Sequence, residues 1–285
     1  MSAATPVPIV ITDSTADLPA DLVAKYGLTV VPLHVVVDGQ VYDEGLDIAP
    51  DAVLSALAGG RSVTTSQPTP AAFEAAYRAA VDAGARSAVS VHISSAMSGT
   101  LTAARLGAAS VPELDVRVVD SLTTAMGLGF AALAAAEAAA ADEPVDTVAA
   151  IAARAAAQSH IVIYAHTLEY LRRGGRIGTA AHLIGSALAM KPLLHVEDGQ
   201  VAPLAKVRTA GKARSRLLDL AVQAAGDGPV DIAVEHLGAP DVADEVASAL
   251  RARLPQLRTL HLGPIGAVIA AHVGPGALLV VVAPS

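Results

Sequence analysis

The chain of 285 residues has no cysteine and no tryptophan, and aromatic residues make up only 2% of it. Without cysteine, it can form neither a disulfide nor a thiolate metal site. Apolar residues nevertheless account for 53% of the sequence. The core is therefore aliphatic, and aliphatic side chains of this kind can also line a long apolar pocket. The length is sufficient for two domains.

Positive charge is also scarce. The formal net charge is −8, and no run of basic residues is longer than Arg172-Arg173. Because nucleic-acid-binding proteins usually carry a basic face, this balance argues against nucleic acid as a partner.

Signals for export and membrane insertion are absent from the sequence. Residues 1–8 have neither the basic region nor the apolar core of a signal peptide. The alanine-rich stretch 126–141 is too short to span a bilayer and contains Glu137. We therefore expect a soluble cytoplasmic protein.

The first half of the chain alternates between strand and helix patterns. Strands are expected at 8–12, 30–37, 40–42, 87–93 and 116–119, and helices near 18 and at 70–82, 99–109, 123–141 and 145–158. Asp38-Gly39 is a strong hairpin signal. Alternation of this kind predicts a three-layer α/β domain with a mainly parallel sheet.

The second half mixes a hairpin with crossover helices. Strands are expected at 161–165, 191–196, 200–207, 231–236, 258–262 and 277–282, and helices at 168–172, 178–189, 211–225 and 240–254. Asp198-Gly199 marks the turn of the hairpin. This pattern predicts a mixed sheet, and we place the domain boundary near Ser159, giving domains 1–159 and 160–285.

Two hydroxyl-rich segments, 64–68 (TTSQP) and 94–100 (SSAMSGT), each precede a helix pattern. They offer many O–H and N–H donors with no obvious general base beside them, which favours holding an anion over attacking a substrate. The alternative is helix capping alone, the common reason for Ser and Thr at such positions. Their place near the carboxyl ends of strands favours a ligand site, because open α/β sheets bind ligands there.

Motifs of an enzyme acting alone are missing from the sequence. It contains no G-x-S-x-G, no G-x-x-x-x-G-K-[ST] and no G-x-G-x-x-G string. These absences count against an acyl hydrolase and a phosphotransferase, although both remain alternatives.

Six strings, both in composition and in their order along the chain, resemble those of the DegV family of bacterial fatty-acid-binding proteins. They are ITDSTADLP at 11–19, TSQP at 65–68, ISSAMSGT at 93–100, VDS at 119–121, YLRRGGRIG at 170–178 and HVGPG at 272–276. The resemblance covers nearly the whole chain, and its main departure is Val273, where the family often has threonine. It implies a three-layer α/β domain and a two-layer domain with a mixed sheet, with a fatty acid bound in a tunnel between them.

The resemblance also implies a function without catalysis by this chain. Some family members are the lipid-carrying subunit of a two-part fatty acid kinase, whose ATP-dependent partner phosphorylates the presented carboxylate. The acyl phosphate then feeds phospholipid synthesis. The chain is thus expected to bind a long-chain fatty acid, with no cofactor and no metal. A lipid-sensing regulator without a kinase is a further alternative.

Residues of the carboxylate site follow from the same resemblance. Thr65 and Ser95 are expected as direct donors, with Ser94 close behind them, and His272 lies near the carboxylate end. The alternative for His272 is a structural histidine in a glycine turn. Ser98 is expected to cap the helix that follows it.

Basic residues of the second half are assigned to docking of the kinase partner. Arg172, Arg173 and Arg176 lie in a glycine-rich turn, and Lys206 and Arg208 follow the second hairpin. The alternative is a solvated loop whose arginines pair with carboxylates. We expect a monomer, allow for transient membrane contact, and assign Asp13 and Asp120 to structural closure of their loops.

Overall fold

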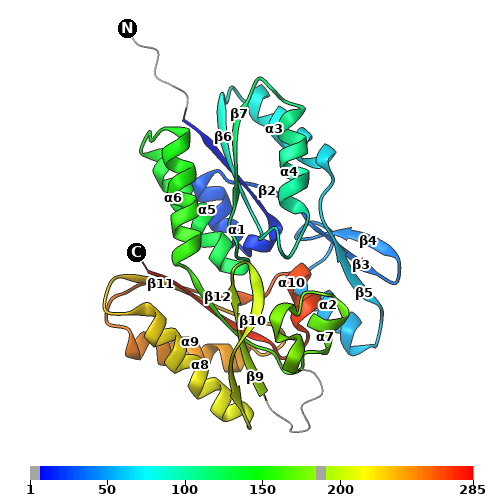
Figure 1. Ribbon diagram of the computed structural model, residues 1–285, viewed down its shortest axis with the longest axis vertical. Helices are drawn as coiled ribbons and strands as arrows, with labels where there is room; N and C mark the ends of the chain where they lie inside the picture. Colours follow the sequence, from blue (N-terminus) through cyan, green and yellow to red (C-terminus); the bar gives the residue numbers. More distant parts are fainter. Residues whose placement is uncertain (1–6, 184–190, 285) are drawn as a thin grey trace. The chain divides into compact units, whose positions relative to one another are not determined.

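The computed structural model describes residues 7–183 and 191–284 (Figure 1). Contacts divide the chain into two compact units. The first unit comprises Met1–Leu33 and Gln67–Ala157, and the second comprises His34–Ser66 and Gln158–Ser285. This division differs from the expected single boundary near Ser159, because the segment 34–66 joins the second unit. Within the second unit, hydrogen bonds join residue 44 to residue 268 and residue 65 to residue 272.

A four-stranded parallel sheet forms the centre of the first unit, in the order β2-β1-β6-β7. Its strands are β1 (Ile9–Asp13), β2 (Thr29–Val31), β6 (Ser87–His92) and β7 (Asp115–Asp120). All six residues of β6 are buried, as expected for a central strand of a parallel sheet that is covered on both faces.

Helices cover both faces of this sheet. Val10 and Ile11 belong to different hydrophobic clusters, one on each face of the sheet. Successive side chains of a strand point to opposite faces. The Val10 face is covered by η1 (Ser14–Ala16), α1 (Ala20–Tyr26), α5 (Ala125–Ala140) and α6 (Val145–Gln158). The Ile11 face is covered by α3 (Pro70–Asp82) and α4 (Thr100–Ala109). The first unit therefore has the three predicted layers.

A six-stranded mixed sheet forms the centre of the second unit, in the order β10-β9-β8-β13-β11-β12. Its strands are β8 (His160–Tyr164), β9 (Lys191–Glu197), β10 (Gln200–Val207), β11 (Val230–His236), β12 (Leu257–Pro264) and β13 (Leu278–Pro284). The β11–β12 pair is parallel and the other pairs are antiparallel. The predicted mixed sheet is confirmed.

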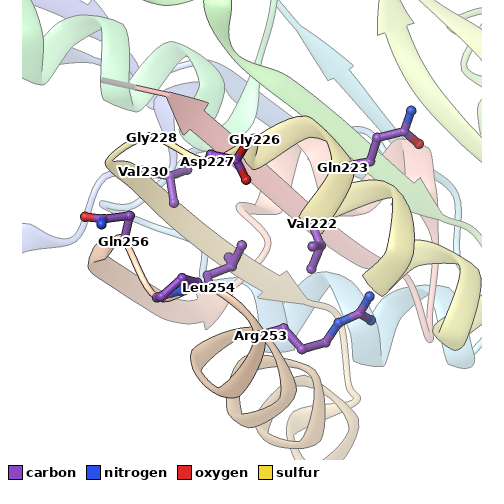
Figure 2. A pocket seen from close by; sticks show the side chains of 10 residues that line it. Val222, Gln223, Gly226, Asp227, Gly228, Val230, Arg253, Leu254 and Gln256 are labelled. Carbon is purple, nitrogen blue, oxygen red and sulfur yellow. The ribbon is translucent and has the colours of Figure 1, made fainter.

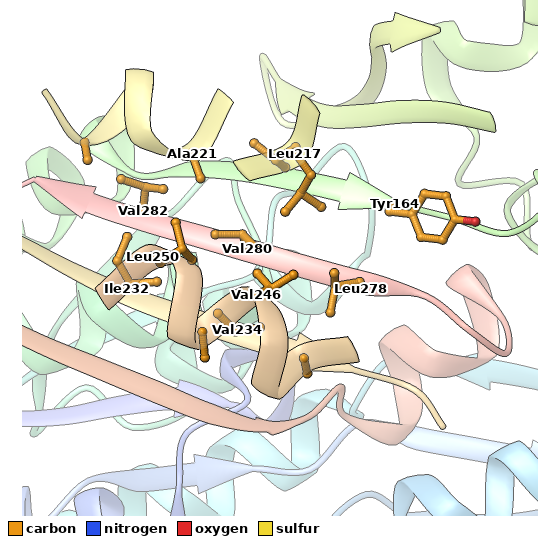
Figure 3. Packing of buried hydrophobic residues seen from close by; sticks show 14 of the residues in the cluster. Tyr164, Leu217, Ala221, Ile232, Val234, Val246, Leu250, Leu278, Val280 and Val282 are labelled. Carbon is orange, nitrogen blue, oxygen red and sulfur yellow. The ribbon is translucent and has the colours of Figure 1, made fainter. Parts of the chain in front are cut away.

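One face of the mixed sheet is packed by α8 (Ala210–Ala225) and α9 (Pro240–Arg253). Figure 3 shows Leu217 and Leu250 directed at strand residues such as Ile232 and Val280. This core is aliphatic except for Tyr164 at its edge, in agreement with the scarcity of aromatic residues.

The segment 34–66 forms a small antiparallel sheet of order β4-β3-β5 with one helix. Its elements are β3 (His34–Val37), β4 (Gln40–Asp43), α2 (Pro50–Ala58) and β5 (Val63–Ser66). The second unit also contains α7 (Glu169–Arg173), η2 (Gly178–Leu183) and α10 (Ala267–Val273). Helix α10 packs against α2, α7, β3 and β5.

Several local predictions were wrong in an instructive way. The expected strand 30–37 is two strands in different sheets, because Pro32 has no N–H with which to continue a ladder. Thr64 and Thr65 lie in strand β5, and His272 lies in the last turn of α10 and not in a glycine turn. Part of the expected helix 178–189 lies outside the described residues.

Within the described ranges, no helix is both long enough and apolar enough to cross a bilayer. The alanine-rich helix α5 has 16 residues, fewer than the roughly 20 that a span requires.

Candidate functional site

Thr65 and His272 are brought together in the second unit. Thr65 Oγ1 lies 2.8 Å from His272 Nε2, although 207 positions separate them in sequence. Thr65 comes from β5, where it pairs with Val35 of β3, and both Thr65 and His272 are partly buried. The structure therefore brings together two of the predicted ligand residues, Thr65 and His272.

Three close contacts fix the helix that carries His272. The buried Glu44 accepts a hydrogen bond from the N–H of Val268 at 2.7 Å, in the first turn of α10. Gly174 lies against His272, where a β-carbon would come within 2.1 Å of Nδ1. Gly274 lies equally close to the ring of Tyr170. Gly174 and Gly274, one from each motif, are thus required by close packing, and this packing joins the arginine turn to α10.

The imidazole of His272 is neutral at physiological pH. Burial, and then the positive charge of Arg176, lower the pKa of His272 to about 4. The imidazole itself therefore adds no positive charge beside the Thr65 hydroxyl.

Ser94 and Ser95 follow β6 in the first unit. Ser94 is buried, its N–H bonds to the carbonyl of Thr123, and its Oγ accepts the N–H of Ala96. Ser95 is exposed and donates its hydroxyl proton to Asp120 Oδ2 at 2.5 Å. Ser94 therefore shapes the loop, whereas the exposed hydroxyl belongs to Ser95.

Asp120 organises the loop that faces Ser95 in the first unit. Its Oδ1 accepts the N–H groups of Ser95 and Leu122, both at 3.1 Å. Leu122 and Ala125 have φ angles of 52° each, a left-handed conformation that is unfavourable for residues other than glycine. Such strain persists where surrounding contacts impose it, often at functional sites. The assignment of Asp120 to loop closure missed its bond to the Ser95 hydroxyl.

Ser98 contributes to the start of α4 but is not its N-cap residue, in contrast to the expectation. Its Oγ accepts the N–H of Thr100 at 3.3 Å, while Gly99 occupies the N-cap position. Ser98 therefore stabilises the helix start from one residue before the cap.

A buried chain of polar side chains lies beneath this loop. Asp13 accepts from His92 Nδ1 at 3.0 Å, His92 Nε2 is 2.6 Å from Ser90 Oγ, and Ser90 is 2.8 Å from the hydroxyl of Tyr77. All four side chains are fully buried, and burial raises the pKa of Tyr77 to about 12. The order Ser–His–Asp is that of a hydrolytic triad, but Ser90 is inaccessible to a substrate.

Asp13 connects that chain to the Ser94–Ser95 loop. Its Oδ2 also accepts the N–H of Ile93 at 2.9 Å, and its Oδ1 accepts from the N–H and hydroxyl of Thr15. The carboxylate thus fixes the residue immediately before Ser94, which agrees with the structural role expected for Asp13.

The arginines of the 172–176 turn are not three independent charges. Arg172 and Arg173 both bind Glu169 at 2.7 Å, and together they lower the pKa of Glu169 to about 2. Arg176 donates to the carbonyl of Gly174 at 2.7 Å. All three arginines are exposed, so this surface combines carboxylate pairing with a net positive charge.

Lys206 lies exposed on β10, and Arg208 lies exposed just beyond it. The contacts found in the described ranges do not join either residue to the arginine turn. Their shared docking role remains a prediction.

A surface pocket of about 390 Å³ lies at the ends of α8 and α9 (Figure 2). Its lining includes Gln223, Asp227, Arg253 and Gln256, and none of the predicted ligand residues. Its mixed lining does not resemble a lipid site. Among the described residues, no group of three or more His, Asp or Glu side chains is placed to hold a metal ion.

Comparisons with known proteins agree over most of the chain. A model of the DegV family, described as one of uncharacterised proteins, matches residues 9–285. A DegV domain-containing protein of Streptomyces coelicolor is 50% identical over 273 residues, covering 96% of this chain and 97% of its own. One from Mycobacterium bovis is 44% identical and covers 95% of each chain.

Two solved structures share this fold and are described as fatty acid binding. A DegV family protein from Thermus thermophilus superposes with a TM-score of 0.92 at 33% identity, covering 97% of this chain and 99% of its own. DegV from Bacillus subtilis superposes with a TM-score of 0.89 at 30% identity, with the same coverage.

Proposed function

Because this chain belongs to the DegV family, we propose that it binds a long-chain fatty acid and presents the carboxylate to a partner kinase. The family relatives from Thermus thermophilus and Bacillus subtilis are described as fatty acid binding. The observation that carries the proposal in this chain is the Thr65–His272 pair, in which a partly exposed hydroxyl lies beside a neutral imidazole.

A neutral donor suits a carboxylate that must react. An arginine or lysine would pair with the carboxylate and weaken it as a nucleophile, whereas a hydroxyl holds an oxygen and leaves electron density for attack on phosphorus. In the proposed reaction, a carboxylate oxygen attacks the γ-phosphorus of ATP on the partner, and ADP leaves. Thr65 is the proposed main donor, and Ser95 is a weaker one because its hydroxyl already donates to Asp120. Ser94 shapes the Ser95 loop, and His272 acts through Thr65.

The acyl chain supplies most of the affinity in this proposal. Each buried methylene contributes roughly 0.8 kcal/mol, so about fourteen of them offer ~11 kcal/mol before association costs of roughly 4–15 kcal/mol. Strands β8 and β13 provide apolar side chains on the sheet face away from α8 and α9, namely Ile161, Ile163, Leu279 and Val281. This aliphatic face suits an acyl chain. The tunnel between the domains that the resemblance implies is part of the proposal.

Mass spectrometry of an organic extract of the purified, denatured protein tests the ligand class. We expect a stoichiometric fatty acid, whose length reports the depth of the tunnel. An empty extract, together with failure to take up added fatty acids, would overturn the proposal.

The docking role has a separate test. Replacing Arg172, Arg173 and Arg176 with Ala is expected to preserve fatty acid binding and to reduce acyl phosphate formation by the kinase. Glu169→Gln is the matched control, because it removes the charge that pairs with Arg172 and Arg173 and is expected to maintain or raise turnover. Unchanged turnover in the triple variant would refute docking at this turn.

A lipid-sensing regulator is the second candidate, and it shares the ligand site. A gene for the kinase subunit in the same genome favours the carrier over the regulator. The hydrolase alternative receives no support from Ser90, His92 and Asp13, because this group is fully buried.

A further inference from the structure

The two ring nitrogens of His272 have different surroundings. Nε2 lies 2.8 Å from the hydroxyl oxygen of Thr65. Nδ1 is shielded from solvent and has no hydrogen-bond partner among the residues that the structure describes. A neutral imidazole carries one proton, so these surroundings decide which nitrogen holds it.

Gly174 packs directly against Nδ1. A β-carbon on Gly174 would lie 2.1 Å from Nδ1 and 2.7 Å from the adjacent ring carbon Cε1, so a C–H bond of the glycine points at Nδ1. A lone pair on Nδ1 accepts such a weak donor, whereas an N–H there would face another hydrogen and remain unsatisfied.

We propose that Gly174 holds His272 as the neutral Nε2–H tautomer, so that His272 donates to Thr65 and commits the Thr65 hydroxyl proton to the ligand. Among the described residues, His272 is the only hydrogen-bond partner of that hydroxyl. Since its oxygen accepts from Nε2, its proton is available for a ligand oxygen. His272 is thereby a positioning residue, and the nature of the ligand rests on the proposed function.

The direction of these hydrogen bonds, from His272 to Thr65 and from Thr65 to the ligand, selects the charge state of the ligand head group. A hydroxyl that must donate binds an ionised carboxylate more strongly than an ester or an alcohol, because charge-assisted hydrogen bonds are the stronger kind. The neutral tautomer adds no proton and no positive charge to the ligand. A bound fatty acid is therefore held as the nucleophilic carboxylate.

Nitrogen NMR of the protein with ¹⁵N-labelled histidine tests the tautomer directly. We expect a pyridine-like Nδ1 and a pyrrole-like Nε2 for His272 from about pH 6 to pH 8, assigned by their loss in His272→Gln. Two histidines serve as internal references: His236 Nδ1 accepts from the N–H of Ala239, and His182 Nδ1 donates to the carbonyl of Thr179. A pyrrole-like Nδ1 or a protonated His272 in this range would overturn the proposal.

Two substitutions test the consequence for binding. In His272→Gln, the amide N–H can replace Nε2–H as a donor to Thr65, so affinity for the fatty acid is expected to stay within about threefold. His272→Leu keeps the volume but lacks the donor, and a loss of about tenfold or more is expected. Equal binding by the leucine variant would show that donation to Thr65 has no role.

Gly174→Ala tests the contact that fixes the tautomer. Its methyl group would displace the ring, so the pyridine-like signal of Nδ1 is expected to change and affinity to fall about tenfold. Gly211→Ala is the matched control, because Gly211 is in the same unit and has no neighbour within 4 Å of an added β-carbon. If Gly174→Ala changed neither readout, the contact would not set the tautomer.

The NMR result is independent of the ligand's identity. An extract without fatty acid, with the Nε2–H tautomer intact, would refute the proposed function and leave this inference standing. A stoichiometric fatty acid with the opposite tautomer would do the reverse.

Discussion

The Ser95 hydroxyl of the first unit and the Thr65 hydroxyl of the second are the two donors predicted for one carboxylate, yet their neighbours differ. Ser95 donates to the carboxylate of Asp120, whereas Thr65 contacts the neutral imidazole of His272. The proton of Ser95 is therefore already engaged, and a negative charge lies beside it. Two similar hydroxyls can thus bind an anion with different strength, because the protein group that each one contacts decides whether its proton is available to the anion.

The anchoring of the two regions is more alike. Asp13 accepts the backbone N–H of Ile93 beside Ser94, and Glu44 accepts that of Val268 in the helix that carries His272. In each unit a buried carboxylate fixes the backbone near a predicted donor. The two regions therefore differ in the hydrogen-bond partner of the hydroxyl and not in how the backbone is anchored.

Asp13→Ala is expected to have the largest effect, because it removes the anchor of the first region. It leaves buried donors from His92, Ile93 and Thr15 without their acceptor, and we expect the free energy of unfolding to fall by about 3–5 kcal/mol. Chemical denaturation measures it. Asp146→Ala removes the exposed ion pair with Arg117 and should change the free energy by less than about 1 kcal/mol. Similar small losses in both variants would contradict the anchoring role.

Acid should lower the free energy of unfolding through the protonation of His272 in the unfolded chain. Its pKa is 6.5 in the unfolded chain and about 4 in the folded protein, so the unfolded chain binds more protons between these values. This contribution, about 3 kcal/mol, is present above pH ~6.5 and is lost as the pH falls toward 4. Chemical denaturation of the wild type and of His272→Gln between pH ~6.5 and 4 measures how the free energy of unfolding depends on pH. The same pH dependence in both proteins would contradict the prediction.

Thr65→Val tests the more available donor of the comparison. It keeps the shape of the side chain and removes its hydroxyl, so affinity for a fatty acid is expected to fall by about 10- to 100-fold, as for a hydrogen bond to a charged group. Titration with a fatty acid and its methyl ester measures the effect. The affinity for the methyl ester should fall much less in Thr65→Val. Thr65→Ser should retain its affinity for the acid. An equal loss for both ligands would indicate damage to the site as a whole.

Ser95→Ala is expected to have the smallest effect, because the Ser95 hydroxyl already donates to Asp120. We expect a reduction in fatty acid affinity of less than about threefold, measured by the same titration. Asp120→Asn removes the neighbouring negative charge and should strengthen binding slightly. A loss in Ser95→Ala as large as that in Thr65→Val would erase the proposed difference between the two hydroxyls.

Much of the fold could be predicted because its signals are local. Helix α3 and strand β6 were expected within one residue of their observed bounds, since Pro70 marks a helix start and a run of small and β-branched residues marks a buried strand. Strand β5 and helices α2 and α10 were not predicted. Strand β5 is polar, and its pairing with β3 across a helix leaves no local pattern.

The sequence by itself determined the aliphatic core, the parallel and mixed sheets and the residue types of the site. The tertiary structure decided which of those residues meet: Thr65 with His272 across 207 positions, Ser95 with Asp120, and Gly174 against the imidazole. Hydrogen-bond direction and pKa depend on such neighbours and on burial, which spacing along the chain does not encode. For that reason the sequence indicated the hydroxyls, whereas the fold distinguished the hydroxyl whose proton is available from the one whose proton is engaged.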